Sequence, residues 1–312
     1  MINYTTQKIG KVTLLTPNIL PEGQYSDKQA EDDLLDVFMS SNPMSRRHEI
    51  LANYPSWPMY YHLTPMRANL LGWYNFPKNS KVLEIGAGPG GVTESLVNKD
   101  IQLTALELSP KRALINAHRN KQHSNLKVVV GNLEDYKPKE KFNYIIVVGV
   151  LEYAGTFIKG GTPYDDFVGI ISKLLHPNGK LLLAIENRLG LKYWTGAKED
   201  HIHTLFEGHN DYPSTSKMKT FGRKELSDLI RANGFVSTYF YYPFPDYKSP
   251  HFIYSDDYYP GKGASFPLKS LPTKTLDRAR YNFMSEQLLM RQLESNDLFR
   301  DFSNSFLIEA SK

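Results

Sequence analysis

A glycine-rich turn is the first feature of this sequence that could bind a ligand. It occupies residues 86–91, Gly-Ala-Gly-Pro-Gly-Gly, and separates a short apolar segment, 81–85, from a segment with helical spacing, 92–98. Glycines at such a turn let a ligand approach the backbone where a Cβ would clash. The turn also satisfies the G-x-G-x-x-G pattern of dinucleotide-binding proteins, which is a weak signal by itself. We expect four of its residues to contact a ligand: Gly86, Ala87, Gly88 and Gly90.

Two glutamates indicate which ligand this is. Glu84 lies at the end of the segment before the turn. A carboxylate there repels a pyrophosphate but favours the ammonium and sulfonium groups of S-adenosylmethionine (SAM). Glu107 ends the next apolar segment, about 20 residues beyond the turn, where an acid accepts hydrogen bonds from both ribose hydroxyls. NAD-binding proteins also have an acid at the position of Glu107. The preference for SAM over NAD therefore rests on Glu84. The alternative is that both are ordinary loop carboxylates.

Further residues of suitable type follow the other apolar segments. After 126–130, Asn132 offers an amide for the adenine amino group and Leu133 a surface for the ring, although Asn is also a common turn residue. Near the N-terminus, Arg67 is a candidate partner for the methionine carboxylate, with a surface salt bridge as the alternative. We complete the expected cofactor site with Tyr61, Leu108 and Gly149.

The elements that must position these residues alternate along the chain. We expect strands at 81–85, 102–106, 126–130, 144–148, 180–185, 235–242 and 305–310. Helical spacing is found at 92–98, 110–121, 164–175, 223–232 and 275–293. Continuous apolar strands that alternate with helices predict an α/β fold, a parallel sheet covered by helices on both faces. The carboxyl ends of such strands share one edge, where ligands bind.

The first 76 residues precede this alternation. We expect helices at 27–39 and 65–73, no strand, and a lid over the SAM site that brings Tyr61 and Arg67 near the methionine end. Residues 77–312 then form the SAM-binding domain, with an insertion at about 245–300 before the last strand.

Together these motifs resemble the Rossmann-like family of SAM-dependent methyltransferases over about residues 81–242. The resemblance implies a seven-stranded, mostly parallel sheet whose last strand is antiparallel. It also implies SAM as cofactor and S-adenosylhomocysteine (SAH) as product. Residues 61–67, 184–194, 198–201 and 241–247 look like bacterial methyltransferases associated with cell-surface polysaccharide and glycosyltransferase systems. That narrower resemblance implies a sugar or glycan acceptor, with a glycosyltransferase as a candidate partner.

Three hypotheses for the acceptor stay open. The first is O-methylation of a sugar, sugar phosphate or cell-surface glycan, with aromatic residues stacking on the ring; the candidates are Tyr60, Tyr61, Tyr193, Trp194, Tyr258 and Tyr259. The second is another small molecule or RNA. Residues 149–153, Gly-Val-Leu-Glu-Tyr, lack the Asn/Asp-Pro-Pro-aromatic motif of many base methyltransferases, and the net charge is only +4, so a nucleic acid is disfavoured. The third is a non-catalytic SAM-binding scaffold for a glycosyltransferase.

The acceptor site is expected on the long loop 186–213, which follows the fifth strand. Methyl transfer to a hydroxyl benefits from a base, and we choose His201, with Asp200 beside it for charge balance. A purely structural His201 is the alternative, which would leave Glu152, Glu186 or His203 as the base, or catalysis by proximity alone. His201, His203, Glu207 and His209 also have metal-ligand types, but histidine-rich loops are commonly only polar, so we expect no metal.

Composition excludes several other chemistries. The chain of 312 residues has no cysteine, which rules out disulfides, Cys-ligated zinc and the cluster of radical SAM enzymes. No apolar run approaches the ~20 residues of a membrane span. The polar residues 1–11 do not resemble a signal peptide, so we expect a cytoplasmic protein.

Overall fold

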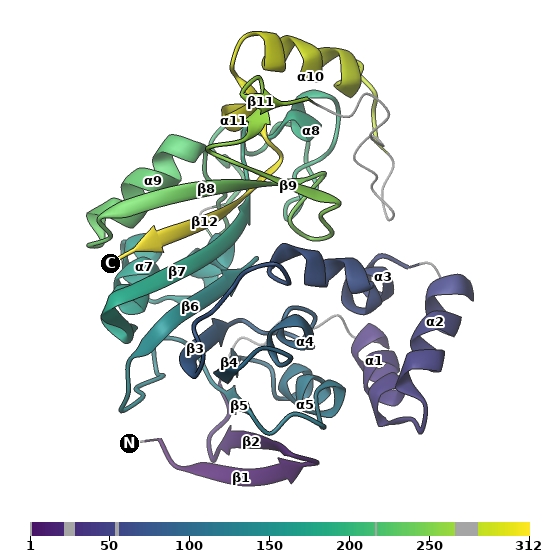
Figure 1. Cartoon of the computed structure of the whole chain (residues 1–312), viewed down its shortest axis with the longest axis vertical. Coiled ribbons are helices and arrows are strands. Elements are labelled where there is room, and N and C mark those ends of the chain that lie inside the picture. Colours follow the sequence, from purple (N-terminus) through teal and green to yellow (C-terminus); the bar gives the residue numbers. More distant parts are fainter. Residues whose placement is uncertain (1, 22–28, 54–55, 216, 266–279) are drawn as a thin grey trace. The chain divides into compact units, whose positions relative to one another are not determined.

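The computed structural model describes residues 2–21, 29–53, 56–215, 217–265 and 280–312 (Figure 1). The chain divides into two compact units. Unit 1 comprises Met1–Val148 and Lys173–Lys180, and unit 2 comprises Gly149–Ser172 and Leu181–Lys312. Each unit is described by itself below.

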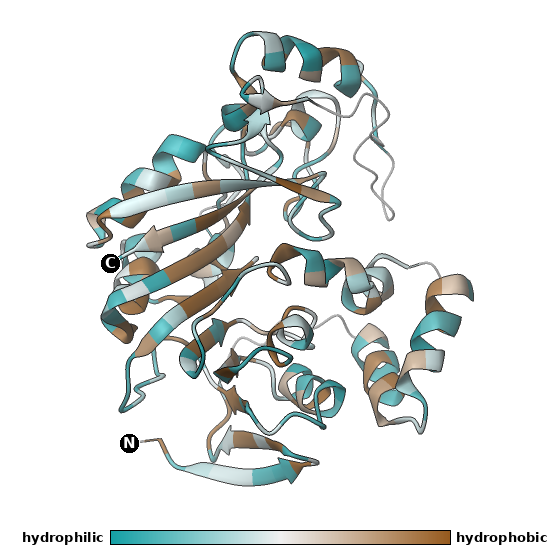
Figure 2. Ribbon diagram, in the orientation of Figure 1, coloured by the Kyte–Doolittle hydropathy of each residue, from teal (hydrophilic) through white to brown (hydrophobic). Residues whose placement is uncertain are grey.

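Four parallel strands form the centre of unit 1. They are β3 (Ser80–Ile85), β4 (Ile101–Glu107), β5 (Leu126–Val130) and β6 (Phe142–Val148). β3 pairs in parallel with β4 and with β6, and β4 pairs in parallel with β5. Apolar residues fill these strands because both faces of a parallel sheet are covered; Figure 2 shows the hydrophobic colour along β6. This part of the predicted sheet is confirmed.

A β-hairpin precedes them, and here the prediction of a purely helical segment 1–76 is wrong. β1 (Tyr4–Ile9) and β2 (Val12–Pro17) are antiparallel, and β2 pairs in parallel with β5. Gly10, at φ +58°, makes the tight turn between them. The order of the strands in unit 1 is therefore β1-β2-β5-β4-β3-β6. By pairing with β5, β2 hydrogen-bonds the backbone groups of a strand that would otherwise form an exposed sheet edge.

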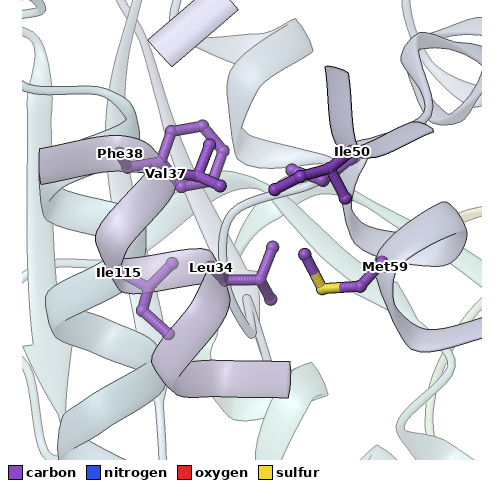
Figure 3. Close-up of a cluster of buried hydrophobic side chains, with 7 residues drawn as sticks. Leu34, Val37, Phe38, Ile50, Met59 and Ile115 are labelled. Atoms are coloured by element: carbon purple, nitrogen blue, oxygen red, sulfur yellow. The ribbon is translucent and has the colours of Figure 1, made fainter. Parts of the chain in front are cut away.

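The described residues of the N-terminal segment after the hairpin contain four helices. They are α1 (Gln29–Met39), α2 (Pro43–Asn53), α3 (Trp57–Leu63) and the 3-10 helix η1 (Pro65–Leu70). The predicted helix 27–39 is confirmed from Gln29, while residues 27 and 28 lie outside the described residues. Figure 3 shows the buried cluster that joins α1–α3 to α5 (Pro110–Arg119): Leu34, Val37, Phe38, Ile50, Met59, Leu63 and Ile115. The remaining helix of unit 1 is α4 (Thr93–Leu96).

Unit 2 contains the second half of β7 (Leu175–Glu186), which begins in unit 1. Its strand order is β7-β12-β8-β9, with β8 at Ser237–Phe244, β9 at Phe252–Ser255 and β12 at Ser305–Ser311. β12 is antiparallel to β8, as expected for the last strand. The large sheet has ten strands, the six of unit 1 and these four, so the prediction of seven is wrong; β10 and β11 form a separate sheet. The three additional strands are β1, β2 and β9.

Short elements complete unit 2. They are η2 (Leu151–Tyr153), α6 (Ala154–Phe157), α7 (Pro163–Leu174), α8 (Leu191–Trp194), α9 (Arg223–Ala232), β10 (Tyr259–Pro260), β11 (Gly263–Ala264), α10 (Glu286–Ser295) and α11 (Phe299–Phe302). The helix predicted at 275–293 begins only at Glu286, because the Ser285 side chain caps it by accepting from the backbone N–H of Leu288. Residues 275–279 lie outside the described residues. Within the described part of the chain, no helix has the length and hydropathy that crossing a membrane requires.

Candidate functional site

The glycine turn connects β3 to α4 in unit 1. Gly86, Gly88 and Gly90 adopt positive φ angles of 67°, 54° and 82°. A Cβ on Gly90 would lie 2.5 Å from Oδ1 of the buried Asn116, so Gly90 is required for packing against α5. A Cβ on Gly88 would meet no described atom within 4 Å. The turn therefore leaves space beside Gly88 that no described atom fills, although Gly88 itself is buried.

Glu84 lies buried at the end of β3. The Thr93 hydroxyl donates to its Oε2 at 2.6 Å, and the Asn116 amide donates to the Thr93 hydroxyl at 3.0 Å. Burial raises the pKa of Glu84 to about 7, against the opposing effects of the Thr93 hydrogen bond and of the Arg67 charge. A cation bound near this carboxyl group would favour its ionised form.

Glu107, at the end of β4, is hydrogen-bonded at both carboxylate oxygens. The backbone N–H groups of Gly88 and Ser109 donate to Oε2 and Oε1, each at 2.8 Å. Burial raises the pKa of Glu107, although Arg112 and these two N–H groups act in the opposite direction. Each oxygen retains a second lone pair that can accept from a ligand hydroxyl. The carboxylate thus links the glycine turn to β4 and is held in one orientation.

Arg67 lies beside the turn with unsatisfied donors. Its guanidinium stacks on the Tyr61 ring at 4.0 Å from the centroid. A Cβ on Gly91 would lie 2.9 Å from Arg67 Nε. Nε and Nη1 are buried and have no hydrogen-bond partner among the described residues. A buried guanidinium in this state is suited to an anionic ligand group, such as a carboxylate.

Ion pairs hold the N-terminal helices against the turn. The Arg47 guanidinium of α2 donates to both oxygens of Glu94 in α4, at 2.9 and 3.0 Å. Arg119 of α5 contacts Glu94 as well and donates to the backbone carbonyl of His62 at 2.8 Å. The start of α4, directly after the glycine turn, is therefore fixed to α2, α3 and α5.

The remaining expected cofactor residues lie in different places. Leu133 is buried and Asn132 half-buried after β5, where the Asn132 carbonyl accepts from Asp135 N–H at 3.2 Å and Tyr136 N–H at 3.1 Å. Leu108 is half-buried directly after β4. Gly149 belongs to unit 2 and has φ +68°; a Cβ there would lie 2.7 Å from the Tyr247 hydroxyl.

A second group of ionisable side chains occurs in unit 2. Glu152 in η2, Glu186 at the end of β7 and His201 each present a buried atom without a hydrogen-bond partner among the described residues: Glu152 Oε2, Glu186 Oε2 and His201 Nε2. Nε2 lies 3.6 Å from Glu186 Oε2. On its other side, His201 Nδ1 lies 3.0 Å from the Tyr153 hydroxyl.

These three groups shift one another's proton affinity. Burial lowers the pKa of His201, but the carboxylates of Glu186, Glu152 and Glu199 outweigh it and raise the pKa to about 9. Burial and the Glu186 charge raise the pKa of Glu152 to about 8. Burial acts to raise the pKa of Glu186 too, yet Lys248 and His201 bring it far below its usual range. The neighbouring carboxylates therefore favour the protonated form of the His201 imidazole.

Asp200 forms ion pairs with two lysine side chains, Lys192 and Lys248. Lys192 Nζ and the Tyr193 hydroxyl donate to its Oδ2 at 2.6 and 2.7 Å, and Lys192 also donates to Asp246 at 2.8 Å. Burial opposes ionisation, but Lys192 and Lys248 hold the pKa of Asp200 far below its usual range. Asp200 stays ionised and contributes charge balance to the two lysines. Sequence reasoning missed both lysines, because no local pattern links position 192 to position 248.

The other histidines of the 186–213 loop do not join His201. His203 is exposed at φ +64°, and Glu207 Oε1 accepts from the backbone N–H of Ser214 at 3.0 Å. The His209 ring packs edge-on against Trp194, with centroids 4.4 Å apart. Within the described residues, the one group whose geometry suits a metal ion is Glu152, Glu186 and His201.

Comparison with known proteins identifies the domain. Residues 83–181 match the model of a family described as a methyltransferase domain. The chain is 26% identical over 109 residues to a ubiquinone biosynthesis O-methyltransferase from Rhodopseudomonas palustris (strain HaA2), which is 35% of this chain and 40% of that protein. It is 25% identical over 122 residues to nodulation protein S from Rhizobium tropici, 38% of this chain and 50% of that protein. The chain thus spans half or less of the length of these relatives.

Among solved structures, a SAM-dependent methyltransferase from Archaeoglobus fulgidus is similar at a TM-score of 0.48 and 14% identity, over 79% of this chain and 92% of that one. The family match is the more informative finding, because it covers Glu84, the glycine turn, Glu107 and Glu152. The chain carries the methyltransferase domain of an enzyme, and SAM is the cofactor of that domain.

Proposed function

We propose that this protein is a SAM-dependent O-methyltransferase whose acceptor is a hydroxyl group of a sugar, sugar phosphate or cell-surface glycan. The observation that carries the proposal is the glycine turn, open at Gly88, with the fixed carboxylate of Glu107 and the unsatisfied guanidinium of Arg67 beside it. A carboxylate for ribose hydroxyls and a guanidinium for an amino-acid carboxylate are the two groups that a nucleoside linked to methionine requires.

The proposed cofactor contacts follow from these residues. Glu107 accepts from the ribose hydroxyls, Arg67 pairs with the methionine carboxylate, and Glu84 favours the ammonium group electrostatically. Gly86, Ala87 and Gly90 shape the turn, while Tyr61 supports Arg67. Asn132, Leu133 and Leu108 are proposed for the adenine side, and Gly149 for the strand end after β6. The segment before β3 is proposed as the lid.

When bound, SAM supplies an electrophilic methyl group on a sulfonium, and SAH is left after transfer. The chain's own contribution is to align the acceptor, exclude water and take up the hydroxyl proton. We propose the group of Glu152, Glu186 and His201 for the last task, with His201 Nε2 as the proton acceptor once it is deprotonated. Its raised pKa makes His201 a strong base but leaves most of it protonated at neutral pH. Asp200 is proposed to act indirectly, by holding Lys192 and Lys248.

A carbohydrate acceptor is supported by the narrower sequence resemblance and by exposed aromatic rings. Trp194 is 39% and Tyr258 58% exposed, so both have ring surface available for stacking. Tyr193 and Tyr259 are 3% exposed each, which makes them packing residues instead. A glycosyltransferase stays a proposed partner on the same resemblance.

The test is product analysis with SAM labelled in the methyl group. Nucleotide sugars, sugar phosphates and surface-glycan fragments form one panel, and amines and phenols form a second. We expect labelled methyl ether on a carbohydrate hydroxyl, detected by mass spectrometry. Transfer only to nitrogen or to a phenol would contradict the acceptor class.

Two variants separate binding from transfer. We expect His201→Gln to retain SAH binding and to lose transfer by about two decades or more, the contribution of a positioned base. His203→Asn is the matched control, because this neighbouring histidine is exposed and Asn tolerates its positive φ. Near-normal transfer in His201→Gln would exclude His201 as the base.

A further inference from the structure

The three unsatisfied atoms in unit 2 lie together. One ligand atom from each of Glu152, Glu186 and His201 lies within 4.8 Å of the other two. Glu186 and Glu152 are 0% and 1% exposed, and the His201 side chain is 8% exposed. Buried polar atoms are normally hydrogen-bonded, so three neighbouring exceptions need a physical explanation.

Hydrogen bonding within the group does not provide one. At 3.6 Å, His201 Nε2 and Glu186 Oε2 form an ion pair when His201 is protonated, but the distance is too long for a hydrogen bond, and Glu152 Oε2 also has no hydrogen-bond partner among the described residues. The separation of His201 Nε2 and Glu186 Oε2 does suit two ligands of one ion, because ligand distances of about 2.0–2.2 Å put neighbouring ligand atoms roughly 3–3.5 Å apart. The three atoms lie within 4.8 Å of one another, so binding one cation draws the widest pair together by up to roughly 1.5 Å.

We propose that Glu152, Glu186 and His201 form a divalent-cation site. Two carboxylates and one imidazole favour a cation of mixed oxygen and nitrogen preference, such as Mn²⁺. Three protein ligands leave coordination positions open, as in catalytic rather than structural metal sites. This assignment replaces the expectation of no metal, and it uses a different ligand set from the histidines at 203 and 209.

The ammonium group of Lys248 does not take the place of the proposed cation. Its ammonium contacts Glu186 at Oε1, the oxygen that also accepts from the Tyr247 hydroxyl at 3.3 Å. Lys248 also contacts Asp246, at 3.2 Å. The other oxygen, Glu186 Oε2, faces His201. Lys248 and the proposed cation therefore bind different oxygens of the Glu186 carboxylate.

Residues that would not bind the cation themselves hold the proposed ligands in position, as is usual in metal sites. In the neutral tautomer that carries its ring N–H on Nδ1, that N–H donates to the Tyr153 hydroxyl and the lone pair is on Nε2, the atom that faces Glu186; a bound cation selects this form over the protonated one. The backbone N–H groups of His201 and Ile202 both donate to Glu199 Oε2, at 2.7 and 2.6 Å, which fixes the loop that carries the histidine.

The role of the cation rests on the proposed function, whereas its binding does not. A cation with open positions would bind an acceptor hydroxyl and lower its pKa. Nε2 cannot hold a proton and a cation at once, so the two roles of His201 exclude each other: the proton-acceptor role proposed above applies to the metal-free protein, and in the loaded protein His201 is a ligand. Metal binding and cofactor binding are therefore measured separately, each without an acceptor.

The experiment is titration of the metal-free full chain with Mn²⁺, followed by the loss of the free-ion signal in electron paramagnetic resonance. We expect one site in the wild type and affinity at least about 100-fold weaker in Glu186→Gln and Glu152→Gln, since even outer partners contribute 10–100-fold. Tyr153→Phe should weaken binding by about tenfold. The matched controls are Glu207→Gln, another buried glutamate of unit 2, and His203→Asn, both with wild-type affinity.

Pulsed resonance on the wild-type complex supplies a readout that needs no variant to fold. We expect nitrogen coupling from one imidazole, and its absence overturns the assignment. No Mn²⁺ binding up to about 1 mM, which is only about −4 kcal/mol of affinity, overturns it as well. So does binding that the controls abolish and the Glu variants retain. SAH calorimetry on the metal-free protein tests the proposed function independently, so failure of one does not imply failure of the other.

Discussion

Replacing Glu107 by glutamine tests the cofactor site at its most constrained side chain. The carboxylate accepts two backbone N–H groups, from Gly88 and Ser109, at 2.8 Å each. The amide of glutamine keeps one acceptor oxygen and turns an NH₂ group toward the other N–H. One buried donor is then unsatisfied, which costs about 1–3 kcal/mol. Removing a buried charge offsets part of this, so we expect a melting temperature lower by only a few degrees.

The effect on the cofactor should be larger than the effect on the fold. Hydrogen bonds from ribose hydroxyls to a charged acceptor contribute about 1.5–3 kcal/mol, which corresponds to roughly 10- to 150-fold in affinity. Calorimetry with SAH measures this, and Glu49→Gln, an exposed glutamate of α2, is the control. Unchanged affinity in a folded Glu107→Gln protein would refute the ribose role. Complete unfolding would refute the estimate of a single lost hydrogen bond.

Three further predictions concern the same unit. Arg67→Gln should weaken SAH binding by about 10- to 100-fold in calorimetry, because a charge-assisted pair is lost; unchanged affinity would leave Arg67 without a ligand role. Gly88→Ala should lose about 1–2 kcal/mol, because alanine is strained at φ +54°, yet should bind SAH poorly, since its Cβ enters the space beside the turn. Gly90→Ala should be strongly destabilised by the clash with Asn116, and equal melting temperatures would contradict both assignments. Because burial raises the pKa of Glu84 to about 7 and a bound ammonium favours the ionised form, SAH affinity should rise between about pH 6 and 8 and stay flat in Glu84→Gln; a wild-type affinity that falls over this range would contradict the role of Glu84.

The central strands could be predicted because their apolar residues indicate burial. β5 and β6 are nearly continuous apolar runs, β3 and β4 carry apolar residues interrupted by a few polar ones, and β12 was found in the same way. The hairpin of β1 and β2 was missed because its threonine-rich strands lie at the border of the sheet, with mostly exposed residues in β1. Such strands are defined by their pairing with β5, which a local pattern does not contain.

The site residues differ in the same way. Some could be predicted from the local sequence, and other properties of the site depend on residues that are far apart in the sequence. Glu84 and Glu107 were found because they lie at the carboxyl ends of strands, Glu84 as the last residue but one of β3 and Glu107 as the last of β4. Glu186 also ends a strand and Glu152 follows one, so the rule that found the first pair applies to the second. The raised pKa of His201 could not be predicted, since it depends on carboxylates 15 and 49 residues away in sequence, at positions 186 and 152.

The central claim is that the domain binds SAM, and calorimetry with SAM, SAH and NAD tests it most directly. The three ligands share an adenosine, so the comparison isolates the methionine part from the pyrophosphate part. We predict one site per chain for SAM and for SAH, and no measurable heat with NAD. Binding of NAD together with no response to SAM or SAH would contradict the account.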